Sequence, residues 1–265
     1  MGAIEQVAGW VAEAERITVM TGAGISTDSG IPDFRGPNGV WTRNPAAERL
    51  STYQDYVRDP AVRRDAWARR VEHPGWDAQP NAGHRALADL ERSGKLVALI
   101  TQNIDELHQR AGSSPDLVHE LHGTMWHAEC VECGWRRPMA ELLDRVRAGE
   151  ADPPCADCGG IVKSATISFG QQLDPDVVDR SAAAATNCDL FLAIGSSLTV
   201  HPAAGLCGLA VDAGARLVVI NAQPTPYDDI AAAVIREPIS KVLPALVASL
   251  HPAYLPNHEG SAHLR

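Results

Sequence analysis

The sequence predicts an α/β fold, a Rossmann-like doubly wound parallel sheet with a smaller zinc-binding and helical module inserted into it. Short runs that are apolar at every position alternate with longer stretches of helical periodicity, and this alternation is typical of βαβ units. Glycine or small polar residues follow each apolar run. Four cysteines form two closely spaced pairs in the middle of the chain.

The predicted strands come first, because a strand covered on both faces is apolar at successive positions. The runs that meet this description span residues 17–20, 96–100, 189–194 and 216–220. Helical periodicity predicts helices over residues 4–15, 82–93, 176–185 and 203–213. Ligands of open parallel sheets bind outside the carboxyl ends of the strands, so the polar residues there predict a binding site.

Two stretches do not fit the sheet and predict the domain organisation. Residues 37–76 are rich in Arg and Trp and predict an insert of short helices and loops, and residues 126–164 carry the paired cysteines without a buried-strand run. We expect a single domain over 1–250. Its large part comprises 1–36, 77–125 and 165–250, and a polar, flexible tail over 251–265 follows it.

Composition excludes several classes of protein. The chain has 23 Lys and Arg against 33 Asp and Glu, a formal net charge of −10, which argues against nucleic acid as a partner and favours a basic one. No apolar run reaches the roughly 18 residues that a membrane span needs. The first helix carries acids and lacks the basic start of a signal peptide. We therefore expect a cytoplasmic protein without membrane contact, and a monomer, because nothing in the sequence demands a second subunit.

The glycine loop after the first strand predicts phosphate binding. Gly22 and Gly24 let the backbone approach a pyrophosphate closely, although Thr27 stands where a dinucleotide fingerprint has its third glycine. A tight turn without a ligand is the alternative. Farther along, Phe34 is suited to shield a ring and Arg35 to bind phosphate; a surface loop with Phe34 in the core is the other interpretation.

The cysteine spacing predicts a structural zinc site. Cys130-x-x-Cys133 and Cys155-x-x-Cys158 provide four thiolates, which complete a tetrahedral zinc and leave no position for water. His127 is an alternative ligand, but four sulfurs already suffice. Cys188 and Cys207 lie outside this pattern and are expected to be small buried residues.

A general base is expected at His122, which Gly123 follows. A neutral imidazole near pH 7 is suited to take a proton from a ribose hydroxyl. His119 and His127 are the alternatives.

With these residues in view, the chain resembles the sirtuin family of NAD-dependent protein deacylases. The matching motifs occur in the family's order over about residues 5 to 248 and include the cysteine pairs. The others are Gly22-Ala-Gly-Ile-Ser26, Gly30-Ile-Pro-Asp-Phe-Arg35, Thr101-Gln-Asn-Ile-Asp105, His122-Gly123, Ile167-Ser-Phe-Gly170, Gly195-Ser-Ser-Leu198 with Val200 and Pro202, and Val219-Ile-Asn221. Residues 94–105 resemble bacterial members, whereas residues 29–41 resemble the branch that includes nuclear chromatin deacylases, so the resemblance assigns no subclass.

The resemblance implies that NAD is a co-substrate and that an acyl-lysine protein or peptide is the substrate. It implies His122 as the general base, with Asn103 and Asp105 holding the ribose and the nicotinamide amide. The implied NAD contacts are Gly22, Ala23, Gly24, Ser26, Thr27, Asp33, Phe34, Arg35, Gln102, Asn103, Ile104, Asp105, His122, Gly195, Ser196, Ser197, Asn221 and Ile239. The implied substrate contacts are Ile167, Phe169, Gly170 and Val200, with Phe169, Gly170 and Val200 pairing with an extended peptide.

The reaction that the resemblance implies transfers the acyl group from lysine to ADP-ribose and releases nicotinamide. Two departures from the family pattern bear on specificity. Gln171 stands where the family often has an acid, and Ala66 with Arg69 stands where members that remove acidic acyl groups carry Tyr and Arg. We therefore expect deacetylation rather than desuccinylation.

Three other functions remain open from the sequence. A mono-ADP-ribosyltransferase would use the same activated ribose. A non-enzymatic NAD-binding adaptor has no need of His122. A dehydrogenase would need the third glycine that Thr27 replaces and a hydride acceptor that the sequence does not show.

Overall fold

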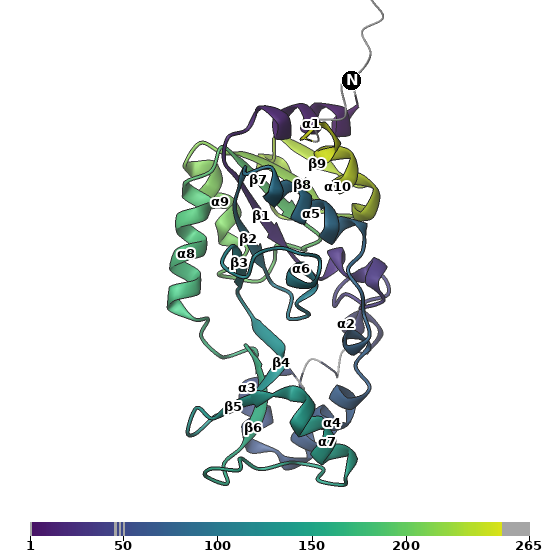
Figure 1. The fold of residues 1–265 in the computed structure, drawn as a ribbon, viewed down its shortest axis with the longest axis vertical. Helices are drawn as coiled ribbons and strands as arrows, with labels where there is room; N and C mark the ends of the chain where they lie inside the picture. The colour runs from purple at the N-terminus through teal and green to yellow at the C-terminus, as the bar shows by residue number, and fades with distance from the viewer. Residues whose placement is uncertain (1, 45–46, 48, 50, 251–265) are drawn as a thin grey trace, which may run out of the picture.

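A computed structural model of the chain describes residues 2–44, 47, 49 and 51–250. The predicted tail over 251–265 lies outside the described residues. A large body and a small body are joined by a few chain segments (Figure 1). No described helix is long and apolar enough to cross a membrane.

The large body is built on a parallel sheet, which confirms the predicted fold class. Within the described residues the sheet has six strands, in the order β3 (Val118–Glu120), β2 (Leu96–Thr101), β1 (Ile17–Thr21), β7 (Leu190–Ile194), β8 (Arg216–Ile220) and β9 (Ala233–Ile235). The four predicted strands are confirmed to within one residue at each end. The edge strands β3 and β9 have three residues each, too few to form an apolar run.

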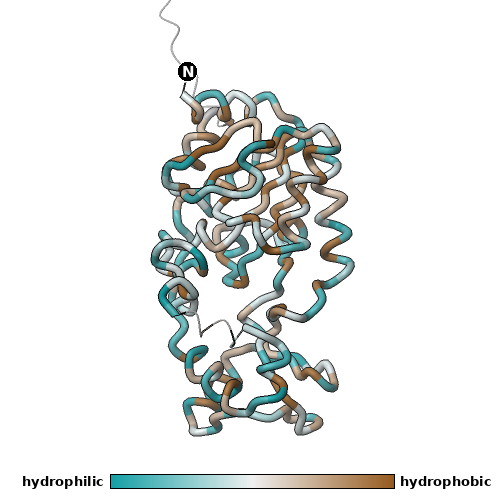
Figure 2. Tube along the Cα trace, turned by 180° about the vertical axis from the view of Figure 1, so that it is seen from behind, coloured by the Kyte–Doolittle hydropathy of each residue, from teal (hydrophilic) through white to brown (hydrophobic). Residues whose placement is uncertain are grey.

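Helices cover both faces of the sheet. Helices α1 (Ala3–Glu13), α5 (Ala82–Arg92) and α10 (Ile239–Val247) pack on one face, and α8 (Pro175–Thr186) and α9 (Gly205–Asp212) pack on the other. Figure 2 shows the most apolar segments gathered in this body. The sequence predicted all of these helices except α10, where Pro244 inside the helix hides the pattern.

The small body combines the two predicted inserts. Residues 37–76 contribute α2 (Val40–Arg43), α3 (Tyr53–Arg58) and α4 (Pro60–Val71). The cysteine region contributes α7 (Met139–Arg147) and an antiparallel sheet in the order β5 (Arg136–Pro138), β4 (Gly123–Cys130) and β6 (Val162–Thr166). Sequence analysis missed these strands because polar residues interrupt them. Lys163 on β6 is buried, and its ammonium group donates to Glu129, Ser164 O and Thr166 O.

The four paired cysteines meet at one point of the small body. Their Sγ atoms all lie within 4.8 Å of one another, with Cys130 and Cys158 at 3.5 Å and Cys133 and Cys155 at 3.7 Å. Tetrahedral zinc with Zn–S bonds of about 2.3 Å places sulfurs roughly 3.8 Å apart, so the donor set fits a structural Zn²⁺. His127 is not in the cluster, and Cys188 and Cys207 are buried in the large body, as expected.

Because the small body has a modest apolar core, we expect its stability to depend on this metal. Cys130→Ala should abolish stoichiometric zinc and lower the Tm by roughly 6–12 °C, the shift for a loss of about 3 kcal/mol in a chain of this size. Metal analysis and calorimetry check this. Cys188→Ala, a buried cysteine outside the cluster, should keep one zinc per chain. A Cys130→Ala protein with full zinc and an unchanged Tm would contradict the assignment.

Candidate active site

The site lies where the direction of winding of the sheet reverses. The chain runs from β1 outward through β2 to β3 and returns to place β7 beside β1 on the other side. The chain after β1 leads to α5 on one face of the sheet and the chain after β7 leads to α9 on the other. Open parallel sheets bind ligands at such a point.

The loops that follow β1 and β7 touch through their backbones. Gly22 N–H donates to Ile194 O at 2.9 Å, and Gly24 N–H donates to Gly195 O at 2.8 Å. A Cβ on Gly24 would lie 2.8 Å from Gly195 Cα, and Gly195 itself has a φ of 63°. Both positions require glycine because the two turns approach each other so closely. The close approach to a pyrophosphate that the sequence suggests stays a prediction.

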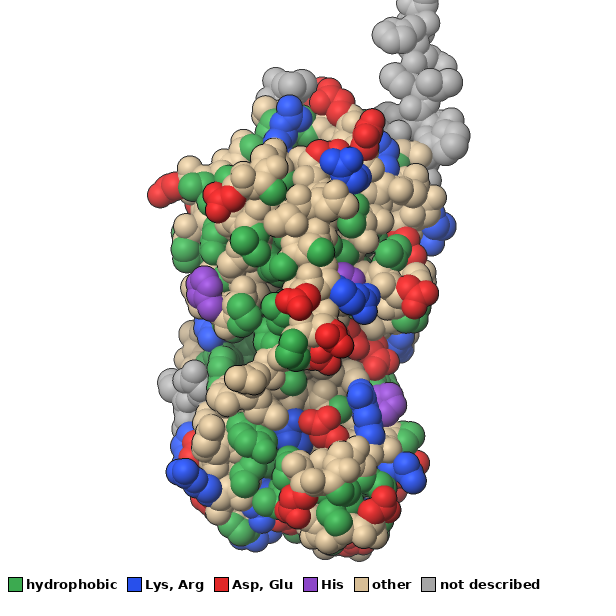
Figure 3. Space-filling model, turned by 90° about the vertical axis from the view of Figure 1, so that its left-hand side faces the viewer, with side chains coloured by type: hydrophobic (Ala, Val, Ile, Leu, Met, Phe, Trp, Pro, Cys, Tyr) green, Lys and Arg blue, Asp and Glu red, His purple; other side chains and the backbone are tan. Residues whose placement is uncertain are grey.

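A cavity of about 930 Å³ opens at these strand ends and extends into the small body. Figure 3 shows the surface hollowed between the two bodies, with hydrophobic side chains around the hollow. Most of the predicted site residues line this cavity. They are Gly22, Ala23, Gly24, Ser26, Asp33, Phe34, Arg35, Gln102, Asn103, Ile104, Asp105, His122, Ile167, Phe169, Gly170, Gly195, Ser196, Ser197, Val200 and Asn221.

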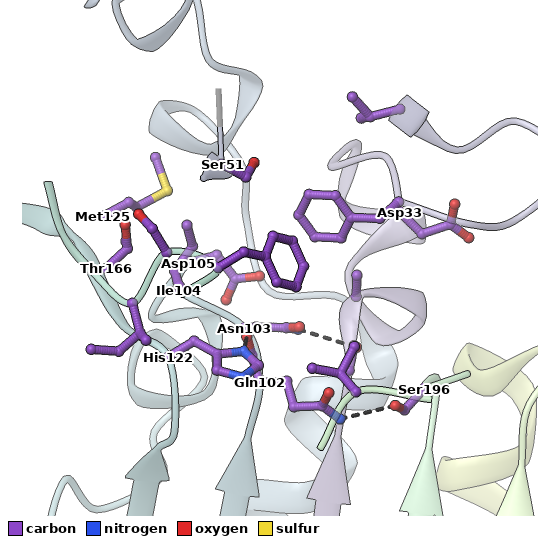
Figure 4. Close-up of a pocket in the computed structure, with 18 of the residues that line it drawn as sticks. Asp33, Ser51, Gln102, Asn103, Ile104, Asp105, His122, Met125, Thr166 and Ser196 are labelled. Atoms are coloured by element: carbon purple, nitrogen blue, oxygen red, sulfur yellow. Dashed lines mark hydrogen bonds between the residues drawn. The ribbon is translucent and has the colours of Figure 1, made fainter. Parts of the chain in front are cut away.

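The loop after β2 presents Asn103 and Asp105 side by side (Figure 4). Asn103 donates its amide to Gly22 O at 3.2 Å. Asp105 accepts from Leu107 N–H at 3.0 Å, and its carbonyl accepts from the Trp126 indole at 3.0 Å. Burial raises the pKa of Asp105, and the hydrogen bonds from Leu107 and Ser26 oppose this. Both side chains are fixed before any ligand binds.

The Ser26 hydroxyl joins Asn103 and Asp105 to a buried histidine that sequence analysis missed. Asn81 N–H donates to His84 Nδ1 at 3.3 Å, so Nε2 carries the proton and donates to Ser26 Oγ at 3.3 Å. Ser26 Oγ accepts from Asn103 at 3.2 Å and donates to Asp105 at 2.7 Å. Burial lowers the pKa of His84 to about 4, which keeps the ring neutral.

His122 is held in the tautomer that a general base needs. Its Nδ1–H donates to Gln102 O at 2.9 Å, which leaves the Nε2 lone pair without a proton. Gln102 in turn donates its amide to Ser196 Oγ at 2.9 Å (Figure 4). Burial lowers the pKa of His122, and the hydrogen bond to Gln102 opposes this shift.

The structure separates His122 from the two alternative bases. His119 is buried on β3, where its Nδ1 lies 3.2 Å from Ser181 Oγ on α8, and His127 lies on β4. Neither lines the cavity, whereas His122 does. His73 and His201 also line it, from the helical insert and from the loop after β7.

The loop after the first glycines brings Phe34 and Arg35 to the cavity. Phe34 is 41% exposed, which excludes the interpretation that it belongs to the core. The Asp33 carboxylate accepts Gly36 N–H at 3.0 Å, so it also closes the turn that follows. Arg35 has no carboxylate partner among the described residues and lies over the Trp41 ring, 4.6 Å from its centre.

Two predicted NAD contacts lie outside the cavity lining. The Thr27 hydroxyl donates to Gly24 O at 3.0 Å. Ile239 begins α10 and packs towards Gly83 on α5. Both remain predictions.

Sequence analysis also missed Arg236, which donates to Asn221 O and Gln223 O and so holds the loop after β8. This role follows only from contacts with residues that are distant in the sequence.

The predicted substrate contacts lie on the other wall. Ile167 N–H donates to His122 O at 2.8 Å. Phe169 N–H donates to Ser51 O at 2.8 Å, and Tyr53 N–H donates to Phe169 O at 2.9 Å. The Phe169 main chain is thus already paired with the helical insert. This corrects the expectation that Phe169 pairs with the peptide through its backbone.

Comparison with known proteins agrees with this geometry. Residues 22–202 match the Sir2 family. The chain is 56% identical to NAD-dependent protein deacetylase 2 of Streptomyces coelicolor over 88% of its length and 97% of that protein. It is 46% identical to NAD-dependent protein deacetylase 1 of Bradyrhizobium diazoefficiens over 93% and 96%.

Solved structures show the same architecture. A Sir2 structure with a deacetylated p53 peptide and 3′-O-acetyl ADP-ribose has a TM-score of 0.86 at 33% identity, covering 93% of this chain and 98% of that one. A Sir2 structure with a p53 peptide and NAD⁺ has a TM-score of 0.84 at 32% identity, covering 94% and 98%. Because the family model covers most of the chain and the relatives are 56% and 46% identical to it over nearly their whole length, the chain belongs to the Sir2 family.

Proposed function

We propose that this chain is an NAD-dependent protein lysine deacetylase. The observation that carries the proposal is a neutral His122, oriented by Gln102 O and facing a cavity that the glycine loop also lines. The names of the similar bacterial proteins and the peptide-bound and NAD-bound Sir2 structures support it. The reaction converts acetyl-lysine, NAD and water to lysine, nicotinamide and O-acetyl-ADP-ribose.

In this proposal, separate groups of residues bind NAD, take up the proton and exclude water. Asn103 and Asp105, fixed through Ser26, hold the ribose and the nicotinamide amide. The His122 Nε2 takes a proton from a ribose hydroxyl and so prepares that oxygen to receive the acyl group. Phe34 shields the reacting face from water. The zinc cluster lies outside the cavity lining and has a structural role.

The peptide side of the proposal uses the wall formed by Ile167, Gly170 and Val200. Because the Phe169 main chain is already paired, an extended peptide would pair with the main chain near Gly170 and Val200, and the Phe169 ring would contact the acyl-lysine. The net charge of −10 favours basic segments around that lysine. We further propose a cytoplasmic monomer that needs no nucleic acid.

Mass spectrometry of the purified protein with an acetyl-lysine peptide, with and without NAD, tests the proposal. NAD-dependent deacetylation with release of O-acetyl-ADP-ribose supports it. Label passing from NAD to protein without any acyl-lysine would support ADP-ribosyl transfer instead. Unconsumed NAD, in folded protein that holds zinc, would support the adaptor.

His122→Ala should reduce kcat by roughly 100-fold or more, because the ribose hydroxyl loses its base. NAD affinity and Tm should change little, since the His122 ring makes a single hydrogen bond to the described residues. Steady-state kinetics and calorimetry check this. His119→Gln is the matched control and should stay within a few-fold of wild type. A larger loss in His119→Gln than in His122→Ala would move the base to His119.

The pH dependence follows from the lowered pKa of His122. The neutral ring is the active form, so kcat/KM should rise with pH through an apparent pKa below the ordinary 6.5 and then level off. A profile from about pH 5 to about pH 9 measures it. His122→Ala should lack this limb. An acidic limb centred above 7 would contradict the lowered pKa.

The acyl pocket favours acetyl over succinyl groups. Ala66 and Arg69 both line the cavity, but Ala66 offers no hydroxyl and Arg69 already pairs with Asp65 at 3.2 Å. A distal carboxylate would therefore be desolvated without a tyrosine hydroxyl to bind it and beside an arginine that is already paired. We expect kcat/KM for an acetyl peptide to exceed that for the matching succinyl peptide by about tenfold or more. Faster desuccinylation would overturn this expectation.

A further inference from the structure

Trp41 lies where three segments of the cavity wall meet. It belongs to the short helix α2 (Val40–Arg43) at the start of the helical insert, and it lines the cavity. It is half-buried and belongs to none of the three apolar cores of the described residues. Among the described residues, the aromatic and cationic neighbours of its ring are Phe34, Arg35 and Phe169, and all three line the cavity.

On one side, Trp41 contacts the loop that carries Phe34 and Arg35. Its backbone N–H donates to Phe34 O at 3.0 Å, and its ring centre lies 4.7 Å from that of Phe34. The Arg35 guanidinium lies over the same ring at 4.6 Å, within the range of a cation–π contact. Gly39 permits this folded-back path, because a Cβ there would lie 2.5 Å from the Phe34 carbonyl.

On the other side, Trp41 contacts the loop after β6. Its ring centre lies 5.5 Å from that of Phe169, an ordinary distance for a tilted aromatic pair. The Phe169 backbone is held in place, because its N–H donates to Ser51 O and its carbonyl accepts from Tyr53 N–H. One side chain therefore joins the predicted NAD loop to the predicted acyl-lysine loop.

We propose that Trp41 is a positioning residue that couples NAD binding to acyl-lysine binding. The inference rests on the proposed function, in which Phe34 and Arg35 meet NAD and Phe169 meets the acyl-lysine. A ligand that orders Phe34 and Arg35 also orders the Trp41 ring. The ring then presents a fixed surface to Phe169, so the second ligand orders fewer groups. By reciprocity, each ligand must increase the affinity for the other by the same factor.

The experiment measures this factor directly. An acetyl-lysine peptide is titrated into the protein by calorimetry, with and without saturating carba-NAD, a non-hydrolysable NAD analogue. The variants are Trp41→Ala, Trp41→Phe and the control Trp10→Phe. Trp10 also lies under an arginine, with the Arg216 guanidinium 5.2 Å from its ring centre. It belongs to α1, however, and packs against the apolar core between that helix and the sheet.

We expect carba-NAD to lower the peptide Kd by the same factor in wild type and in Trp10→Phe. In Trp41→Ala this factor should be smaller by about fivefold or more. Trp41→Phe should keep part of it, because a smaller ring still lies between Phe34 and Phe169. In steady state, Trp41→Ala should raise both KM values more than it lowers kcat. Its Tm should stay near that of wild type, since no core is disturbed.

Equal coupling factors in Trp41→Ala and wild type would overturn the inference, as would a factor of one in wild type. An equal loss in Trp10→Phe would also overturn it, because the effect would then be general. If Trp41→Ala fails to fold, Trp41→Phe decides by the same comparison. Wild type that binds neither peptide nor carba-NAD would instead overturn the proposed function itself.

Discussion

The cavity depends on the close contact of two backbone turns, Gly22–Gly24 after β1 and Gly195 after β7. Gly24 N–H reaches Gly195 O at 2.8 Å because neither glycine carries a side chain that would hold the turns apart. This contact fixes Ser26 beside the loop after β2, where its hydroxyl reaches Asp105 at 2.7 Å. A Cβ at Gly24 or Gly195 would push the turns apart and disturb a hydrogen bond that tolerates little displacement. The positions of the Asn103 and Asp105 side chains therefore depend on glycine at both turns.

Most of the large body was predictable, because buried parallel strands are apolar at every position. The runs at 17–20, 96–100, 189–194 and 216–220 are apolar except at Thr18 and at the first residues Asp189 and Arg216. The small sheet was not predictable in this way. Lys163 lies inside β6. Its burial is tolerated only because Glu129 on the neighbouring strand and two carbonyls accept hydrogen bonds from its ammonium group. The sequence alone does not show which residues are paired across strands.

The sequence likewise identified several site residues but not the contacts that position them. The resemblance placed His122, Asn103 and Asp105 correctly in the cavity lining, but the tautomer of His122 follows from the position of Gln102 O. His84 was missed because its contact is with Ser26, 58 residues earlier in the chain. Trp41 was missed for the same reason, since Phe169 becomes its neighbour only in the folded molecule. Thr27 and Ile239 fit the family pattern but lie outside the lining.

The pairing of Phe169 with Ser51 and Tyr53 has a consequence for how such a protein diversifies. The wall that faces the peptide is held by the helical insert, whereas Asn103, Asp105 and His122 are held by the sheet and the turns at its edge. Amino-acid replacements in the insert can therefore reshape the choice of peptide while the reacting groups keep their positions. The two tasks are inherited on different parts of one chain.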